Sequence, residues 1–205
     1  MTNEELKKYD FILLLDKSGS MATPDCANGT TRWAAAKEAT IALARKCAEF
    51  DSDGITVIPF AGSFKAYDNI TDGPDQVNKI FSENEPNGST DTAKVIKHVT
   101  DAYFSRKKAG NAKPIIVLVI TDGTPDSKSA LAQVIVDATK QIDKDEEIGI
   151  SFIQVGKDPG ASEFLKMLDD DLVKQGAKFD IVDTKTMDEV GEMPLADVLV
   201  AALTD

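Results

Sequence analysis

The sequence predicts an α/β fold: a single doubly wound, mostly parallel sheet flanked by helices. Two observations support this prediction. Short apolar runs rich in Ile and Val recur along the chain, as expected of parallel strands that are covered on both faces. Segments whose apolar residues follow a helical period separate these runs. Strands that alternate with helices indicate this fold class, and 205 residues suffice for one large domain, so we expect residues 1–205 to form a single domain.

The expected strands are five buried runs and one edge strand. The clearest are FILLL at 11–15 and IIVLVI at 115–120. The runs at 55–60 and 148–155 have the same composition, and 179–182 is a weaker example. A more polar pattern at 64–70 predicts a short edge strand.

The expected helices are defined by apolar residues at alternating steps of three and four. The first helix covers about 33–50, with the apolar stripe Trp33, Ala36, Thr40, Leu43, Cys47 and Phe50. The others cover about 74–83, 91–108, 131–142, 164–172 and 195–203. Cys47 lies on the apolar stripe, so we expect it to pack in the core. His98, the single histidine, falls on a polar helix face and is expected to be solvated rather than to act as a base.

The charge of the chain limits its partners. Thirty-five acidic against twenty-three basic residues give a net charge of −12, which disfavours nucleic acid and anionic membranes as partners. No apolar run approaches the roughly 18 residues needed to cross a bilayer. The N-terminal segment is polar and lacks the order of a secretion signal, and two cysteines do not make a disulfide framework. We therefore expect a cytoplasmic protein.

Oxygen-bearing side chains follow two of the expected strands. Asp16, Ser18 and Ser20 come directly after the run at 11–15, and Asp122 follows the run at 115–120. A third group of hydroxyls lies in the glycine-containing loop 87–92. Ligands of open parallel sheets bind beyond the carboxyl ends of the strands, so these groups could converge on one point. A set of oxygen ligands without His or Cys favours a hard cation such as Mg²⁺ or Mn²⁺.

The three loops carry a resemblance to a known family. DKSGSM at 16–21 resembles the DxSGSM signature of von Willebrand factor type A (VWA) domains, the fold shared with integrin I domains. GSTDT at 88–92 resembles the family's G-G-T-x-T-like turn, with Ser89 replacing the second glycine and Thr90 in the ligand's place. TDG at 121–123 resembles the third loop. By this resemblance, the ligands of a metal-ion-dependent adhesion site (MIDAS) are Asp16, Ser18, Ser20, Thr90 and Asp122.

The resemblance also implies a function. It implies a Rossmann-like VWA domain that is not an enzyme but binds Mg²⁺ or Mn²⁺ and, through the ion, captures an Asp or Glu side chain of a partner protein. Stand-alone domains of this family work as intracellular adaptors or complex subunits, which makes a MoxR-type AAA+ ATPase a candidate partner. The polar link at 23–31 would lie on the rim of the site and influence specificity.

Each motif also has a structural alternative. Asp16, Ser18 and Ser20 could form an Asx or Ser/Thr turn. TDG is a common turn at the end of a strand. Thr90 and Asp91 could cap the following helix, which would not prevent Thr90 from reaching an ion.

Two alternative functions follow from other classes of protein. Mg²⁺-dependent phosphohydrolases of the haloacid dehalogenase type also place an Asp at a strand end, but their DxDxT motif needs a second Asp as acid/base, and Ser18 stands there. The chain lacks the GxxxxGK[ST], GxGxxG and GxSxG motifs of nucleotide-binding proteins and serine hydrolases. The other alternative is a purely structural domain in a larger assembly.

Overall fold

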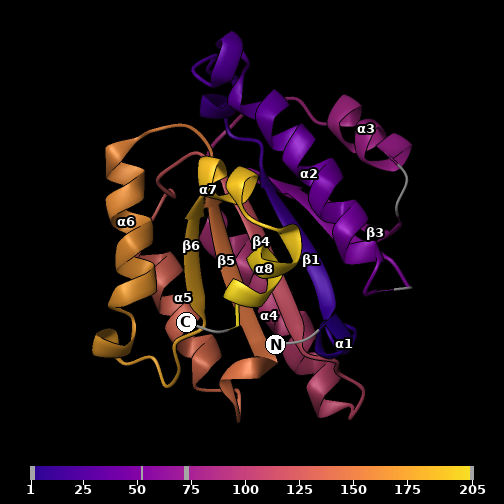
Figure 1. The fold of residues 1–205 in the computed structure, drawn as a ribbon. Coiled ribbons are helices and arrows are strands. Elements are labelled where there is room, and N and C mark those ends of the chain that lie inside the picture. The colour runs from indigo at the N-terminus through magenta and orange to yellow at the C-terminus, as the bar shows by residue number, and fades with distance from the viewer. Residues whose placement is uncertain (1–2, 52, 72–73, 204–205) are drawn as a thin grey trace.

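The computed structural model describes residues 3–51, 53–71 and 74–203, and within them a six-stranded sheet lies between two layers of helices (Figure 1). The strand order is β3-β2-β1-β4-β5-β6. All neighbouring strands run parallel except β3, which pairs antiparallel with β2 at one edge. The predicted fold class is therefore confirmed.

The bounds of the elements are as follows. The strands are β1 Asp10–Asp16, β2 Ile55–Phe60, β3 Tyr67–Ile70, β4 Ile115–Thr121, β5 Ile148–Gln154 and β6 Val182–Thr186. The helices are α1 Asn3–Leu6, α2 Arg32–Ala48, α3 Pro74–Glu83, α4 Thr92–Lys108, α5 Lys128–Thr139, α6 Pro159–Asp170, α7 Met187–Glu192 and α8 Leu195–Ala201. Short 3₁₀ turns cover Gly19–Ala22, Ala27–Gly29, Asp145–Glu147 and Val173–Gln175.

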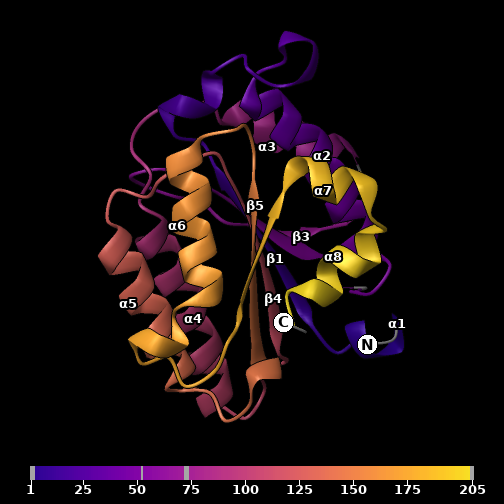
Figure 2. The same cartoon turned by 60° about the vertical axis from the view of Figure 1, so that its left-hand side comes forward.

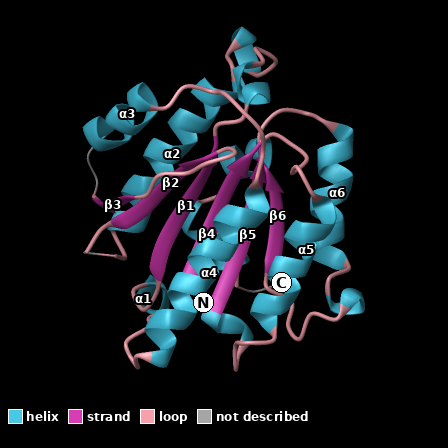
Figure 3. Ribbon diagram, turned by 180° about the vertical axis from the view of Figure 1, so that it is seen from behind, coloured by secondary structure: helices cyan, strands magenta, loops and turns pink. Residues whose placement is uncertain are grey.

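Each face of the sheet has its own hydrophobic core. Successive side chains of a strand point to opposite faces, so Ile12 and Leu14 join one core while Leu13 and Leu15 join the other. Helices α4, α5 and α6 cover the first face, and α1, α2, α3, α7 and α8 cover the second (Figure 2). The view from behind shows α4 and α5 across the parallel strands (Figure 3). Burial on both faces explains why these strands are almost continuously apolar.

Most predicted elements are found in the structure. The strands at 11–15, 55–60, 115–120 and 148–155 are confirmed to within a residue, and the predicted edge strand is β3. Cys47 is buried in the second core and His98 is exposed, as predicted. Among the described residues, no helix combines the length and the apolar character needed to span a membrane.

One strand was predicted in the wrong place. The sequence pattern favours 179–182, whereas β6 begins at Val182 and ends at Thr186. Ile181 is buried against the core, but it belongs to the loop that leads into the strand. The strand itself is polar because it pairs only with β5 and forms the edge of the sheet. The short helices α1 and α7 were not predicted, since four and six residues show too few apolar repeats.

Candidate metal site

The candidate site lies at the carboxyl ends of two neighbouring strands. β1 and β4 pair in parallel, with Leu15 opposite Ile120. Asp16 is the last residue of β1, and Asp122 comes directly after β4. Because the strands are adjacent and end together, the two carboxylates are brought to the same point of the sheet edge.

Hydrogen bonds connect the predicted side chains of these two strand ends. Asp16 Oδ1 accepts from the backbone N–H of Ser18 over 2.7 Å, as in the Asx turn that was the structural alternative for this motif. The hydroxyls of Ser18 and Ser20 lie 3.1 Å apart. Ser20 Oγ in turn donates to Asp122 Oδ1 over 2.9 Å. Hydrogen bonds therefore connect four of the five predicted ligand residues into one cluster, with Asp16 joined through the backbone N–H of Ser18.

Thr90 is held beside this cluster by its own loop. The N–H of Gly19 donates to Gly88 O over 3.1 Å, so the loop before α4 rests on the loop after β1. Thr90 is also tied to the segment after β4: its N–H donates to Asp126 Oδ1, and its carbonyl accepts from the N–H of Asp126, both over 2.9 Å. Asp91 caps α4 by accepting from Lys94 N, so the capping role falls to Asp91 and not to Thr90.

Asp16 is the most deeply buried member of the cluster, together with Asp122. Both are fully buried, at 0% exposure. Burial raises the pKa of Asp16 to about 6; hydrogen bonds from Ser18 and Thr121 oppose this shift, and the nearby Asp122 charge adds to it. A cation at this point would favour the ionised form of Asp16, because opposite charges at close range stabilise one another.

Arg32 supplies positive charge to the same cluster. It is the first residue of α2, and its Nη1 donates to Asp122 Oδ2 over 2.8 Å. Its Nε and Nη2 donate to the two oxygens of Asp25, over 2.9 and 2.6 Å. Hydrogen bonds to Asp25 and then to Asp122 raise the pKa of Arg32 above its ordinary value, although burial opposes the shift. Arg32 therefore links the rim of the site to its buried carboxylate.

A hollow of about 810 Å³ opens beside the cluster. Its walls come from residues 25–27, from the end of β5 and from the start of α7. Asp25 lines this hollow and also pairs with Arg32, so the hollow adjoins the candidate site. The lining includes the apolar side chain of Met187 and the charged side chains of Lys157 and Asp188.

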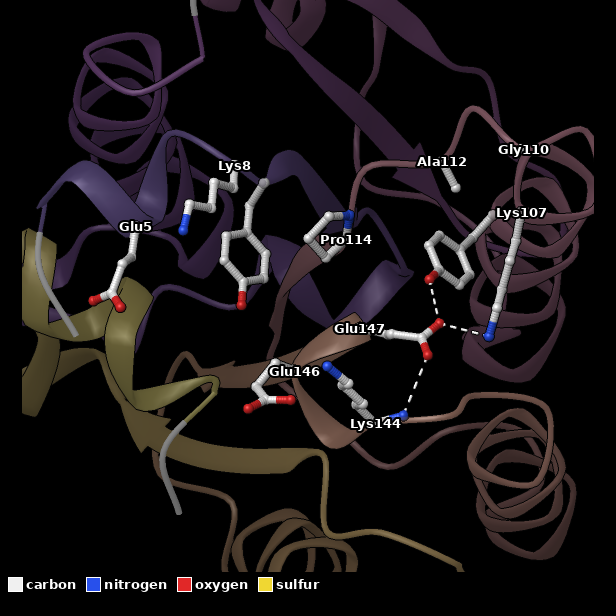
Figure 4. Close-up of a pocket in the computed structure, with 11 residues that line it drawn as sticks. Glu5, Lys8, Lys107, Gly110, Ala112, Pro114, Lys144, Glu146 and Glu147 are labelled. Atoms are coloured by element: carbon white, nitrogen blue, oxygen red, sulfur yellow. Dashed lines mark hydrogen bonds and ion pairs between the residues drawn. The ribbon is translucent and has the colours of Figure 1, made fainter.

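A second hollow, of about 670 Å³, lies at the other end of the sheet, beside the amino ends of β1, β4 and β5 (Figure 4). Glu147 stands in its wall, just before β5, where it forms an ion pair with Lys107 at 2.8 Å and accepts from the Tyr103 hydroxyl at 2.5 Å. The backbone N–H groups of Asp143 and Lys144 complete its partners. These contacts hold the turn that leads into β5, and we assign them to stability.

The donor set of the candidate site fits a hard divalent cation. Mg²⁺ takes one or two carboxylates and completes its coordination with neutral oxygens. Asp16 and Asp122 could supply the carboxylates, the hydroxyls of Ser18 and Ser20 are neutral oxygens of the same cluster, and Thr90 is the third hydroxyl that the sequence predicts. Within the part of the chain that the structure describes, no group of three or more His, Cys, Asp or Glu side chains could hold a metal. The mixed set of carboxylates and hydroxyls suits Mg²⁺ or Mn²⁺.

Sequence reasoning missed three side chains around this cluster: Asp25, Arg32 and Asp126. Asp126 follows Asp122 by four residues, and a polar residue so soon after a strand-end TDG could have been noticed. Asp25 and Arg32 gave no such signal, because their contact with the site depends on the path of the loop at 23–31. The metal role of the five predicted ligands itself stays a prediction.

Comparison with known proteins agrees with the resemblance seen in the sequence. The profile of the von Willebrand factor type A domain matches residues 11–124, which is more than half of the chain. No curated protein matches.

Several solved structures share the fold. The VWA domain of SpRpn10 aligns with a TM-score of 0.63 at 14% identity, covering 91% of this chain and 96% of that one. BatB from Bacteroides thetaiotaomicron gives a TM-score of 0.59 at 15% identity, covering 94% and 98%. Manganese-loaded TRAP protein from Plasmodium vivax gives 0.59 at 17% identity, covering 98% and 75%. At these identities, the comparisons establish the shared fold.

Proposed function

Because the chain belongs to the von Willebrand factor type A domain family, we propose that it is a protein-interaction module with a divalent ion at its MIDAS. The ion, Mg²⁺ or Mn²⁺, would be held by Asp16, Ser18, Ser20, Thr90 and Asp122. An Asp or Glu side chain of a partner protein would complete the site. When bound, the ion would supply the positive charge that attracts the partner's carboxylate.

One observation carries this proposal: the hydrogen-bonded cluster that joins the ends of β1 and β4. Asp16 Oδ1 accepts from the backbone N–H of Ser18 over 2.7 Å, the hydroxyls of Ser18 and Ser20 lie 3.1 Å apart, and Ser20 Oγ donates to Asp122 Oδ1 over 2.9 Å. The polar atoms are already gathered by the backbone, so little reorganisation is needed to hold an ion. A site that is formed in advance avoids the entropic cost of ordering its ligands.

The neutral hydroxyls have a functional consequence. Serine and threonine hydroxyls are neutral, so they can occupy coordination positions without offsetting the positive charge of the ion. An ion held partly by hydroxyls would therefore still attract a further anion. Ser20 is exposed while Asp16 and Ser18 are buried, which supports an ion that is anchored below and open to solvent above. A partner's carboxylate would approach from this open side.

The hollow beside the site could receive the side chains next to the partner's acidic residue. Its walls, which include rim residues 25–27, the end of β5 and the start of α7, add apolar groups and a lysine that the oxygen cluster lacks. We propose an adaptor or complex subunit in the cytoplasm, for which a MoxR-type AAA+ ATPase remains a candidate partner. The net charge of −12 argues against nucleic acid or an anionic membrane in this role.

No observation favours the alternatives. The phosphohydrolase needs an acid/base two residues after Asp16, where the Ser18 hydroxyl instead pairs with Ser20. A purely structural domain would have no use for two fully buried carboxylates at neighbouring strand ends, since burying charge costs free energy even where hydrogen bonds or an ion pair offset part of it.

The test is a titration of the metal-free protein with Mg²⁺ by calorimetry. We expect one site in the wild type and no measurable binding in Asp16→Asn or Asp122→Asn. Asp101→Asn, an exposed substitution on α4, is the matched control and should bind as the wild type does. Equal binding in all four proteins would refute the assignment of the site.

Two further assays separate the functions. Partner proteins retained on the immobilised wild type with Mg²⁺ should be released by a chelator and should not be retained by Asp122→Asn. Retention that ignores the chelator would favour the structural alternative. Turnover of a phosphate ester that is lost in Asp16→Asn would instead show the phosphohydrolase.

A further inference from the structure

Arg32 is fixed at the edge of the candidate site by three segments of the chain. It donates to Asp122 from one side and to both oxygens of Asp25 from the other. Its third neighbour is the backbone after β5: a Cβ atom at Gly156 would lie 2.7 Å from Arg32 Nε. The side chain is only 13% exposed, so the guanidinium is held in place rather than free in solvent.

Arg32 and Asp122 form an ion pair in which the Asp122 side chain is fully buried and the Arg32 side chain is 13% exposed. Asp122 is fully buried, and its two oxygens have different partners: Oδ1 accepts from Ser20, and Oδ2 accepts from Arg32. A buried carboxylate that loses its only cation is strongly destabilising. Arg32 therefore gives Asp122 a positive partner when no metal is bound, and it fixes which oxygen of Asp122 faces the serine hydroxyls.

The same charge must act on a metal ion. Asp16 and Asp122 contribute two negative charges to the cluster, and Arg32 offsets one of them at hydrogen-bonding distance from Asp122. A divalent cation bound by Asp122 would lie close to the guanidinium, and like charges at such a range repel one another. The positive charge of Arg32 also adds to the attraction that an incoming carboxylate meets.

We infer that Arg32 is a charge-setting residue of this site: it holds Asp122 in place, weakens the binding of the divalent ion, and strengthens the pull on a partner's carboxylate. This inference rests on the proposed function, since it concerns the same ion. Asp25 has the opposite effect on Mg²⁺ binding, because its negative charge on the exposed rim partly offsets the positive charge of Arg32. Arg32 is thus a positioning residue, and it sets the balance between holding the metal and attracting the acidic ligand.

The test compares Mg²⁺ binding and thermal stability in three variants. Neighbouring charges change the proton affinity of a carboxylate by about tenfold or more, so we expect Arg32→Gln to bind Mg²⁺ about tenfold more tightly than the wild type. The metal-free variant should also melt at a lower temperature, because Asp122 loses its partner. Addition of Mg²⁺ should therefore raise its melting temperature by more than that of the wild type.

Two controls make the result independent of folding. Arg32→Lys keeps the positive charge and should restore Mg²⁺ affinity toward the wild-type value. Asp25→Asn changes an exposed side chain, leaves Arg32 its full charge, and should weaken Mg²⁺ binding. If Arg32→Gln does not fold, the opposite effect of Asp25→Asn on the affinity still decides the question.

The outcomes separate this inference from the proposed function. Tighter Mg²⁺ binding in a folded Arg32→Gln supports the charge-setting role, and weaker or unchanged binding overturns it and leaves Arg32 a structural residue. If Arg32→Gln does not fold, Asp25→Asn decides alone: weaker Mg²⁺ binding supports the role, and unchanged or tighter binding overturns it. Absence of Mg²⁺ binding in the wild type would instead remove the proposed function on which the inference rests.

Discussion

The Thr121 hydroxyl donates a hydrogen bond to Asp16 Oδ2 over 2.7 Å, joining the last residues of two adjacent strands. Thr121 is 1% exposed, so the bond is shielded from water. With Ser18 N on Oδ1 and Thr121 on Oδ2, both oxygens of Asp16 are held by donors. The orientation of the carboxylate is therefore fixed before any ion arrives.

This relationship predicts the effect of Thr121→Val. The substitution keeps the shape of the side chain but removes the donor to Asp16, which should reduce the free energy of unfolding by about 1–3 kcal/mol. Loss of a partner that orients a metal ligand should also weaken Mg²⁺ binding by about 10–100-fold. Urea unfolding and calorimetry measure the two effects.

The control for this prediction is Thr100→Val. Thr100 is also buried, but its hydroxyl donates to a backbone carbonyl within α4, at Ile96. This variant should bind Mg²⁺ as the wild type does. Wild-type Mg²⁺ affinity in Thr121→Val would show that Asp16 does not depend on Thr121 for its orientation.

Gly149 on β5 predicts a second effect, on stability alone. A Cβ atom there would lie 2.2 Å from the carbonyl oxygen of Ala202 and 2.8 Å from Leu203 Cδ2. Gly149→Ala must therefore displace the segment after α8, and overpacking of this kind costs about 1–3 kcal/mol. The free energy of unfolding should fall by that amount in urea.

The matched control is Gly191→Ala, on α7. A Cβ atom at Gly191 meets no atom within 4 Å, and its backbone is not left-handed. Alanine also favours helix, so this variant should be at least as stable as the wild type. Equal stability of the two variants would mean that the segment after α8 yields without cost.

Glu147 predicts how stability depends on pH. Burial acts to raise its pKa, but hydrogen bonds from Lys107, Tyr103 and two backbone N–H groups outweigh burial and lower the pKa to about 2. A lowered pKa means that the stabilisation is present above the unfolded value, near 4.5, and is lost as the pH falls toward 2. With allowance for solvent screening, we expect a contribution of about 1–2 kcal/mol at pH 7.

The measurement compares the wild type with Glu147→Gln between pH 7 and pH 2.5. The difference in their free energies of unfolding should shrink as the pH falls through this range. Glu146→Gln, which changes an exposed neighbour in the same turn, is the matched control. A difference that stays constant with pH would contradict the role of the Glu147 charge.

Much of the fold could be predicted because its strands are buried on both faces. The runs at 11–15 and 115–120 are apolar on both sides, so their pattern is clear without knowledge of the partners. The edge strand β6 lacks this signal: its sequence, VDTKT, is polar because only one edge is paired. The pattern therefore favoured the apolar segment just before it.

Some residues of the candidate site could likewise be predicted from the sequence, and others could not. Asp16, Ser18, Ser20 and Asp122 were found because they follow apolar runs directly, and parallel strands bring such ends together. Thr90 was chosen through the family resemblance, and the structure holds its loop against Asp126 and Gly19. Arg32 could not be predicted, because it reaches Asp122 from a helix start ninety positions away along the chain, through a loop without a periodic pattern.

The most direct test of the central claim is a crystal structure of the protein with Mn²⁺, with the ion located by its anomalous scattering. The account predicts one strong peak at the carboxyl ends of β1 and β4, within coordination distance of the Asp16, Ser18 and Ser20 oxygens. Asp122 and Thr90 should lie beside it, directly or through water. A Mn²⁺ peak elsewhere, or none at this position under saturating Mn²⁺, would contradict the account.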